Sequence, residues 1–380
     1  MHARIGWQGL KTSEFLETGD YYLITGTDFE NGHVNLGKAH YIDKSRYDMD
    51  QKLKLKNGDI LITKDGTIGK VAYLENLDKP GTLNAGVFIV RPIKKSIYKQ
   101  YLFQYLATPF LLKYAKSHST GGTIQHLNQG IIKNFPVALP STEEQLVISK
   151  FLKSISKTIT LHEEKQRQLE QLKKALLQKM FADETGYPVL RFKGFTEKWE
   201  QVKLSKTSRS YSGGTPKVGV HEYYDGRIPF IRSGEIASKS TELTISKVGL
   251  NNSSAKLVSK GDILYALYGA TSGEVSLSKI NGAINQAILA IKPIDGYENY
   301  FLMTWLQKEK EQITRTYLQG GQGNLSAKIV MNLVVNIPSL SEQSQIAQIF
   351  SKLDKTITLH DKKIQYLKQL KRGLLQKMFV

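Results

Sequence analysis

The chain contains an internal repeat with a period of 198 residues, and this repeat restricts the folds open to it more than any other feature. Residues 140–181 align without a gap to residues 338–379, and 22 of the 42 paired positions are identical. The block Lys-Thr-Ile-Thr-Leu-His at residues 157–162 returns unchanged at residues 355–360. A repeat of this length predicts one structural unit present twice, so we expect two similar modules within the 380 residues.

The segments that precede the constant regions resemble each other only loosely. The Gly-Asp-Ile-Leu at residues 58–61 corresponds to residues 261–264, and Asn84 corresponds to Asn285. The alignment shift drifts along these segments, which indicates small insertions that differ between the copies. The layout is therefore a variable segment followed by a near-constant one, twice over.

The near-constant segments are predicted to be long helices. Apolar side chains recur at alternating steps of four and three residues over more than four heptads, which is typical of a coiled-coil seam. Each segment opens with Pro-Ser followed by Glu-Gln, a pattern that predicts a serine N-cap. A helix of about 39 residues would be roughly 58 Å long. The predicted seam residues are Ile148, Leu152, Ile155, Ile159, His162, Leu169 and Leu176 in the first helix, and Ile346, Phe350, Leu353, Ile357, His360, Ile364, Leu367 and Leu374 in the second.

The order of the segments predicts how the helices run. The first helix leads from the first variable segment to the second, and the second helix begins where the second variable segment ends. If the seams pack together, the helices must be antiparallel, with a pseudo-two-fold axis between them and His162 and His360 within a few turns of each other. A metal or proton-switch role is open to this matched pair, but a polar seam residue that sets the register is the favoured interpretation.

The variable segments are predicted to mix helices and strands, which gives an α+β fold class. Short apolar or alternating runs bounded by Gly-rich turns predict strands at residues 21–25, 59–63, 87–90, 228–232, 262–267 and 287–291. Leu, Tyr and Trp at helical spacing predict helices over residues 98–115 and 299–317. Aromatic side chains at such positions are more often core residues than base-stacking platforms.

The charge of the chain favours a polyanionic partner. Lys and Arg number 53 against 34 Asp and Glu, which gives a net charge of +19, and nucleic acid is the simplest partner for such an excess. The excess does not lie in a basic tail, because residues 1–139 and residues 193–337 each hold 18 basic and 12 acidic residues. No secretory signal and no apolar run of about 20 residues is present, so we expect a cytoplasmic protein.

The sequence offers no catalytic constellation. The absence of cysteine excludes disulfides, thiolate zinc sites, iron–sulfur clusters and a cysteine nucleophile. No Asn-Pro-Pro-Tyr motif of an amine methyltransferase occurs. Residues 66–71 lack the spacing and the hydroxyl residue of a phosphate-binding P-loop, and residues 320–324 are not framed as a dinucleotide-binding loop. The eight His show no metal-ligand spacing, and no acidic cluster indicates a two-metal nuclease.

These features together resemble one known family. Gly213-Gly214-Thr215-Pro216, the two Gly-Asp-Ile-Leu blocks and Pro-Ser-x-x-Glu-Gln at the start of a repeated helix are similar to the specificity subunit of type I restriction–modification systems. Residues 4–10, 25–29 and 63–70 resemble one subtype of its target-recognition domain. The resemblance covers essentially the whole chain. The chain departs from the family pattern at one point. The segment at residues 195–200 precedes the second variable segment but has no counterpart in the first copy, because Met1 aligns near Ser208.

The resemblance implies an architecture and a set of partners. The chain would bind double-stranded DNA and two DNA-adenine methyltransferase subunits and, in the restriction form, two motor–nuclease subunits. It would catalyse nothing and bind no metal or cofactor, since S-adenosylmethionine, ATP and Mg²⁺ would belong to the partner subunits. The implied segments are a target-recognition domain at residues 1–139, a conserved helix at 140–182, a second target-recognition domain with its linker at 183–337, and a second conserved helix at 338–380.

Two basic domains at a fixed separation would read two short DNA sites about one helical turn, roughly 34–36 Å, apart. The domains differ, so the site should be asymmetric and bipartite. Phosphate contacts would position each domain and base contacts would specify the sequence. The side chains predicted to contact DNA are Lys64, Asp65, Thr67, Lys70, Thr123, Gln125 and His126 in the first domain, and Lys217, Arg232, Tyr268, Thr271, Gln322 and Asn324 in the second.

Two alternatives remain open at this stage. One is a methyltransferase or nuclease with an unrecognised active site, which would transfer a methyl group or cut DNA without a partner. The other is a coiled-coil protein that binds nucleic acid without sequence preference, which would show a salt dependence but no specificity ratio.

Overall fold

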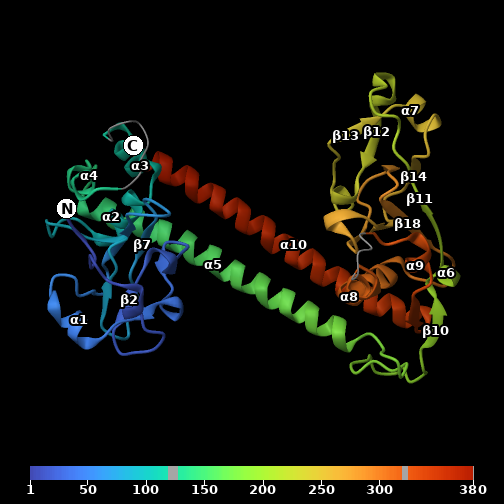
Figure 1. The fold of residues 1–380 in the computed structure, drawn as a ribbon, viewed down its shortest axis with the longest axis horizontal. Helices are drawn as coiled ribbons and strands as arrows, with labels where there is room; N and C mark the ends of the chain where they lie inside the picture. Colours follow the sequence, from blue (N-terminus) through green and yellow to red (C-terminus); the bar gives the residue numbers. More distant parts are fainter. Residues whose placement is uncertain (119–126, 319–323, 380) are drawn as a thin grey trace. The chain divides into compact units, whose positions relative to one another are not determined.

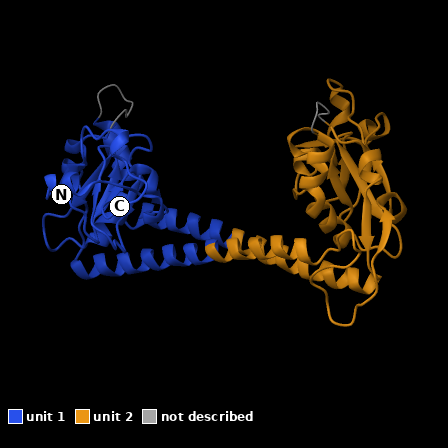
Figure 2. Ribbon diagram, turned by 60° about the horizontal axis from the view of Figure 1, so that its bottom comes forward, with its two compact units in different colours: residues 1–163, 362–380 blue, residues 164–361 orange. Residues whose placement is uncertain are grey.

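The computed structural model describes residues 1–118, 127–318 and 324–379. The chain forms two compact units, coloured separately in Figure 2. Unit 1 comprises residues 1–163 and 362–380, and unit 2 comprises residues 164–361. Each unit therefore combines one variable segment with parts of both constant helices. The predicted domain boundaries at residues 139, 182 and 337 follow the sequence repeat and stay a prediction.

Unit 1 is built on a six-stranded sheet in the order β1-β9-β6-β7-β4-β3 and a three-stranded sheet in the order β5-β2-β8. The interior strands are short runs of apolar residues whose side chains are buried on both faces, as in β6, where all four residues are buried. The strands are β1 (His2–Ile5), β2 (Tyr22–Ile24), β3 (Phe29–Glu30), β4 (His33–Val34), β5 (His40–Tyr41), β6 (Ile60–Thr63), β7 (Val71–Tyr73), β8 (Gly81–Leu83) and β9 (Val87–Arg91).

Two short helices of unit 1 begin at side-chain caps. Thr108 accepts a hydrogen bond from the N–H of Phe110 and Pro109 takes the first helical position, so α3 starts there. Asn128 caps α4 in the same way, accepting from the N–H of Ile131. The helices are α1 (Lys44–Met49), α2 (Lys99–Leu106), α3 (Pro109–Ser117), α4 (Gln129–Asn134) and the first part of α5 (Thr142–Lys179).

Unit 2 holds two four-stranded sheets, in the orders β11-β18-β15-β16 and β13-β12-β17-β14, and the two-stranded ladder β10-β19. Its strands are β10 (Glu200–Lys203), β11 (Ser208–Ser212), β12 (Tyr224–Ile231), β13 (Leu243–Ile245), β14 (Lys256–Val258), β15 (Ile263–Ala266), β16 (Val275–Leu277), β17 (Gly282–Ile284), β18 (Ile288–Pro293) and β19 (Val334–Ile337). Its helices are α6 (Leu204–Thr207), α7 (Lys247–Asn251), α8 (Asn299–Leu318), α9 (Ala327–Met331) and most of α10 (Leu340–Lys377), labelled in Figure 1 where room allows.

The two units repeat the same central strand pairing. In unit 1, Ile60 of β6 lies opposite Val90 of β9, and in unit 2, Ile263 of β15 lies opposite Ile291 of β18. Both pairs are antiparallel and almost fully buried. The mixed α+β fold class predicted from the sequence is confirmed, and the loosely similar variable segments share one scaffold.

The constant segments form two 38-residue helices, α5 and α10. Ser141 accepts a hydrogen bond from the N–H of Glu144 at 3.2 Å, and Ser339 accepts one from Glu342 at 3.4 Å, so a serine caps each helix. Behind the cap, Gln145 accepts a hydrogen bond from the N–H of Tyr98 at 2.9 Å, which fixes the start of α5 against the entry to α2. Gln343 does the same for Glu298 at 3.0 Å, so the repeated Glu-Gln motif anchors each long helix to its module.

Within each unit the two long helices run antiparallel. In unit 1, Ile155 and Ile159 of α5 form a buried cluster with Ile364 and Leu367 of α10. Nearer the start of α5, Leu152 lies in the same core as Leu375 of α10. Because α10 residue numbers rise as α5 numbers fall, the helices point in opposite directions there.

The helix pairing in unit 2 has the same sense. Lys173 of α5 forms an ion pair with Asp354 of α10 at 2.7 Å, and Leu176 packs against a core that contains Ile346 and Phe350. Seam burial is uneven: the apolar seam residues Ile148 to Ile159 are buried, whereas Leu169, Leu353 and Ile357 are half-buried.

Some positions differ from the prediction, and some stay untested. His162 belongs to unit 1 and His360 to unit 2 and each is half-buried, so their predicted closeness stays a prediction. The single helix predicted over residues 98–115 was wrong: it is broken between α2 and α3, because Pro109 cannot donate the hydrogen bond that would continue α2. None of the helices in the described parts of the chain is both long and apolar enough to cross a bilayer.

Candidate nucleic-acid interface

In each unit, a candidate loop follows an interior strand. The same pattern of backbone hydrogen bonds holds this loop in both units. In unit 1, loop 64–70 connects β6 to β7, and in unit 2, loop 267–274 connects β15 to β16. The N–H of Lys64 donates to the carbonyl of Gly86 at 2.7 Å. The N–H of Leu267 donates to the carbonyl of Ala287 at 2.8 Å. Lys64 and Leu267 are therefore corresponding residues.

A second pair of hydrogen bonds fixes the far ends of these loops. The N–H of Thr63 donates to the carbonyl of Lys70 at 2.9 Å, and the N–H of Ala266 donates to that of Glu274 at 2.8 Å. Loop 267–274 thus contains one residue more than loop 64–70, and Lys70 corresponds to Glu274.

Glycines permit both loops to turn tightly. Gly69 and Gly273 occupy corresponding positions with φ of 74° and 83°, in the left-handed region that a residue with a Cβ rarely adopts. A Cβ on Gly69 would lie 2.4 Å from a methyl carbon of Leu112. The loop backbones are thus set by the scaffold, and variation is left to the other side chains.

Loop 64–70 presents four of the seven residues predicted for the first domain: Lys64, Asp65, Thr67 and Lys70. The Lys64 ammonium lies 3.2 Å from the carboxylate of Asp65, and both side chains are partly exposed. Thr67 is exposed, and its carbonyl accepts a hydrogen bond from the Thr63 hydroxyl. Lys70 donates to the carbonyl of Phe29, so its ammonium also ties the loop to β3.

Loop 267–274 presents a different set of side chains. Tyr268 is exposed, and its backbone forms an isolated antiparallel bridge with Asn324, which is also exposed. Thr271 is half-buried in the one-turn helix Gly269–Thr271. The structure thus brings three of the predicted residues of the second domain together, Tyr268, Thr271 and Asn324.

One further turn lies beside loop 64–70, and its residues were not among the predicted site residues. The turn Gly26–Asp28 abuts the end of β6, since a Cβ on Gly26 would lie 2.9 Å from Thr63 Cγ2. Thr27 is exposed on this turn, whereas Asp28 is buried and accepts a hydrogen bond from the N–H of Thr25 at 2.7 Å. Burial raises the pKa of the Asp28 carboxyl, and the hydrogen bonds from Thr25 and Thr27 oppose that shift. The Thr-Gly-Thr-Asp pattern was the signal that could have found Thr27.

Arg232 and Lys217 of the second domain lie in different environments. Arg232 donates to Glu235 at 3.1 Å and also contacts Glu242, and these carboxylates raise the pKa of its guanidinium. Lys217 is exposed between β11 and β12. Two carboxylates therefore hold the Arg232 guanidinium, and its predicted contact with DNA stays a prediction.

The remaining predicted residues lie outside the described parts of the chain; they are Thr123, Gln125, His126 and Gln322. The N–H of Leu127 donates to the carbonyl of Lys64 at 3.3 Å, and that of Leu325 donates to Leu267 at 2.9 Å. In each unit, a leucine that follows the undescribed segment is therefore hydrogen-bonded to the first residue of the candidate loop.

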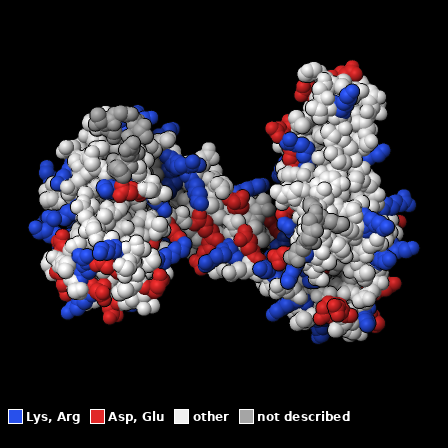
Figure 3. All heavy atoms as spheres, in the orientation of Figure 1, with Lys and Arg blue, Asp and Glu red and all other residues white. Residues whose placement is uncertain are grey.

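Basic side chains do not form one continuous surface on either unit in the face drawn in Figure 3. Lys and Arg are interspersed with Asp and Glu over each unit. Mixed charge of this kind favours local phosphate contacts over a uniform basic groove.

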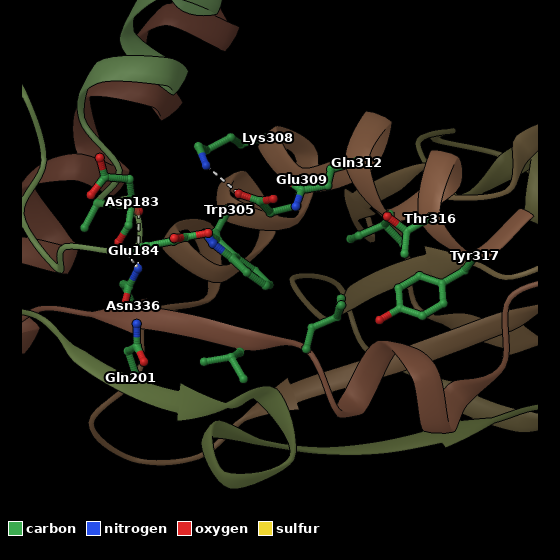
Figure 4. A pocket seen from close by; sticks show the side chains of 14 residues that line it. Asp183, Glu184, Gln201, Trp305, Lys308, Glu309, Gln312, Thr316, Tyr317 and Asn336 are labelled. Atoms are coloured by element: carbon green, nitrogen blue, oxygen red, sulfur yellow. Dashed lines mark hydrogen bonds and ion pairs between the residues drawn. The ribbon is translucent and has the colours of Figure 1, made fainter. Parts of the chain in front are cut away.

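A cavity of about 600 Å³ lies within unit 2, and Figure 4 shows its lining. Asp183, Glu184 and Glu309 line it against a single basic residue, Lys308, which is paired with Glu309. An acidic lining of this kind repels phosphate, so this cavity is not part of the candidate interface. Within the described ranges, no group of three or more His, Asp or Glu is placed to hold a metal ion.

Comparison with known proteins gives one family. The family model described as "Type I restriction modification DNA specificity domain" matches residues 8–171 and again residues 173–369. The type I restriction enzyme MjaIX specificity subunit of Methanocaldococcus jannaschii is 22% identical over 377 residues, which cover 95% of this chain and 86% of that protein. The EcoBI specificity subunit of Escherichia coli is 29% identical over 123 residues, 32% of this chain and 26% of its own length.

The fold is also similar to solved structures. The S subunit of a type I restriction–modification system from M. genitalium matches with a TM-score of 0.65 at 16% identity, over 100% of this chain and 93% of that one. A chain from a structure of an assembled type I restriction–modification system matches with a TM-score of 0.57, also at 16% identity, over 100% and 99% of the two chains. At this identity the likeness concerns the fold.

Proposed function

The chain belongs to the type I restriction–modification DNA specificity family, and we propose that it is the subunit that reads DNA in such a complex. Each unit would read one short half-site, and the two half-sites would differ in sequence. The chain would also hold two adenine methyltransferase subunits and, in the restriction form, two motor–nuclease subunits.

This proposal rests on one observation. The two units share the same loop backbone, but the loop carries chemically different side chains in each unit. Lys64 and Asp65 in unit 1 correspond to Leu267 and Tyr268 in unit 2, as the shared hydrogen bonds to Gly86 and Ala287 establish. A lysine–aspartate pair can donate to guanine acceptors or accept from a cytosine amine, whereas an exposed tyrosine offers one hydroxyl and an apolar ring. Different base edges would therefore suit the two loops.

The far ends of the loops differ in charge as well. Lys70 in unit 1 corresponds to Glu274 in unit 2, and Glu274 is paired with Lys310 of α8. A lysine at this point is suited to a phosphate, which a glutamate repels. An asymmetric, bipartite site follows from these differences, since identical loops would favour a palindrome.

The long helices would set the distance between the half-sites. Each is 38 residues long and continuous, which corresponds to about 57 Å at 1.5 Å per residue. Because α5 begins in unit 1 and ends in unit 2, and α10 runs back, the length of both helices would fix the number of unread base pairs.

The outward faces of these helices are suited to protein partners. Val147, Phe151 and Leu161 of α5 are exposed, as are Leu359 and Tyr366 of α10. Apolar side chains left exposed along a helix are typical of an interaction surface. We assign the methyltransferase subunits to these faces and to the adjoining surface of each unit.

The chain itself would supply recognition and no chemistry. S-adenosylmethionine, ATP and Mg²⁺ would act in the partner subunits, and the complex would work on DNA in the cytoplasm. Incubation of the purified full chain with labelled S-adenosylmethionine and duplex DNA should then give no methyl transfer. Methylation by the chain alone would favour the enzyme alternative.

Binding selection tests the recognition itself. The full chain is incubated with a duplex library that carries random sequence, at a fixed salt concentration, and bound duplexes are sequenced. We expect enrichment of two short, different elements at a constant spacing. Binding without enrichment would favour the sequence-independent coiled-coil alternative.

A further inference from the structure

One lysine of the constant helices occurs in both copies of the repeat but has a counterion in only one. In unit 2, the Lys173 ammonium lies 2.7 Å from Oδ1 of Asp354. The other carboxylate oxygen of Asp354 accepts a hydrogen bond from the Tyr300 hydroxyl at 2.6 Å. Lys173 also donates to Gln307 at 3.3 Å, so the charge is neutralised and held in place.

The corresponding lysine in unit 1 is Lys371, and its surroundings have changed. The repeat places Ser156 where unit 2 has Asp354, and Gln100 where unit 2 has Tyr300. The Ser156 hydroxyl donates to the carbonyl of Leu152, within its own helix. Lys371 therefore lacks the carboxylate that its counterpart uses.

No other carboxylate in the described parts of the chain takes that place. Glu75 lies 2.7 Å from Lys153, and Glu163 lies 2.7 Å from Lys368. Both nearby acids are thus engaged by other lysines, and Lys371 forms no ion pair with any described residue. Burial lowers the pKa of Lys371, because transfer out of water penalises its charged form.

Lys371 faces an empty space instead of a side chain. A cavity of about 630 Å³ lies in unit 1 between the β-sheet, α2, α5 and α10. A smaller cavity of about 240 Å³ shares Lys371 and Gln104 with it. Six basic side chains line the two cavities against one acidic residue, Glu75; they are Lys70, Lys153, Lys157, Lys368, Lys371 and Arg372.

The surface around the cavity is basic as well. Residues 362–380 contain six Lys or Arg and no Asp or Glu. In Figure 3, blue atoms gather over the part of α10 that belongs to unit 1. An anion approaching this end of α10 is attracted before it reaches Lys371.

A second group in the cavity is also unsatisfied. Gln104 is 4% exposed, and its amide nitrogen donates to the carbonyl of Ser149 at 3.2 Å. Its Oε1 atom is buried and has no hydrogen-bond partner among the described residues. A buried acceptor of this kind is costly unless a donor reaches it. Val71, Phe103 and Ile159 supply an apolar wall of the same cavity.

We propose that this cavity is a binding site for a small organic anion, a phosphate or carboxylate that also carries a hydrogen-bond donor. Its charged group would take the place beside Lys371 that the Asp354 carboxylate occupies beside Lys173. Its donor would satisfy Gln104, and its carbon skeleton would lie against the apolar wall. A volume of about 630 Å³ lies within the range of small-molecule sites.

The charged half of the proposal is tested with inorganic phosphate and with citrate, each titrated calorimetrically into the full chain at constant ionic strength. We expect both to bind to one site. Lys371→Met should weaken binding by tenfold or more. Ser156→Asp should abolish it, because that substitution supplies the carboxylate that unit 2 carries internally. Lys173→Met is the matched control in unit 2 and should leave binding unchanged.

Two measurements distinguish specific binding in this cavity from nonspecific attraction of anions to basic side chains. Adenosine monophosphate, which joins a phosphate to an amine donor, should bind more tightly than inorganic phosphate, and Gln104→Leu should remove that advantage while phosphate binding persists. The proposal is overturned if none of the three anions binds at millimolar concentration, or if Lys173→Met and Lys371→Met weaken binding equally. Unchanged binding in the Ser156→Asp variant would overturn it too, even if Lys371→Met failed to fold.

Discussion

Asp59 accepts two hydrogen bonds from the guanidinium of Arg91, each 2.7 Å long. Asp59 is 1% exposed and also accepts a hydrogen bond from the N–H of Lys56 at 2.8 Å. The repeat preserves this relation in unit 2, where Asp262 lies 2.9 Å from Lys292. The carboxylate of each Gly-Asp-Ile-Leu motif thus ties the start of a central strand to the end of its neighbour, and the motif is structural.

Replacement of this buried carboxylate should destabilise unit 1. Asp59→Asn leaves the partly buried Arg91 without a counterion, and we expect a loss of about 3 kcal/mol in the free energy of unfolding. Hydrogen exchange measured by mass spectrometry on β6 and β9 should report this loss locally. Asp262→Asn is the matched control and should cost less, because its partner Lys292 is 39% exposed against 31% for Arg91. Equal protection of β6 in the Asp59 variant and the unaltered chain would contradict the structural role.

Replacement of two lysines should affect one half-site only. Lys64→Ala combined with Lys70→Ala should weaken binding at the first half-site by about 10- to 100-fold and leave the second unchanged. Binding is measured on duplexes in which one half-site is intact and the other is scrambled. Tyr268→Ala is the counterpart in unit 2 and should weaken only the second half-site. A loss shared equally by both half-sites would show that these residues are assigned wrongly.

Shortening both helices by one heptad should shorten the spacer. Residues 169–175 of α5 lie opposite residues 352–358 of α10, as the Lys173–Asp354 ion pair indicates. Deletion of both segments preserves the heptad seam and shortens each helix by about 10 Å, which corresponds to about 3 base pairs of DNA. Selection from a library with variable spacing should return the same half-sites closer together. A spacer of unchanged length would refute the role of the helices in setting it.

Removal of the Lys371 charge should stabilise the chain in a pH-dependent way. Since the pKa of Lys371 is lowered on folding from its usual 10.5, the unfolded chain binds more protons between the two values, and the stability of the unaltered chain rises with pH there. Lys371→Met should therefore raise the free energy of unfolding below the folded-state pKa, and the gain should shrink as the pH approaches 10.5. Chemical denaturation at a series of pH values measures this. Lys173→Met should destabilise instead, because it leaves Asp354 unpaired.

The long helices could be predicted because their determinants are local. The Ser caps and the heptad pattern place α5 and α10 within two or three residues of their observed ends. The strands β6, β9 and β15 were also predicted closely, since each is a short apolar run between turn residues. The helix predicted over residues 98–115 failed because Pro109 and Thr108 start a new helix in the middle of a continuous helical pattern.

The candidate interface could be predicted only in part, because its geometry depends on tertiary contacts. Loop 64–70 was found from its composition, but its correspondence with loop 267–274 becomes visible only in the backbone hydrogen bonds that both make. The role of Lys70 in holding the carbonyl of Phe29 could not be foreseen for the same reason. The cavity beside Lys371 is lined by four elements from distant parts of the sequence, so no local sequence pattern could predict it.

The most direct test of the central claim is a map of methylated adenines in the source genome. It reports what the complex reads without any assumption about which residues make contact. We expect one methylated motif made of two short, different elements separated by a constant number of unspecified base pairs, lost when the gene for this chain is deleted. A motif that is contiguous or palindromic, or one that persists after the deletion, would contradict the account.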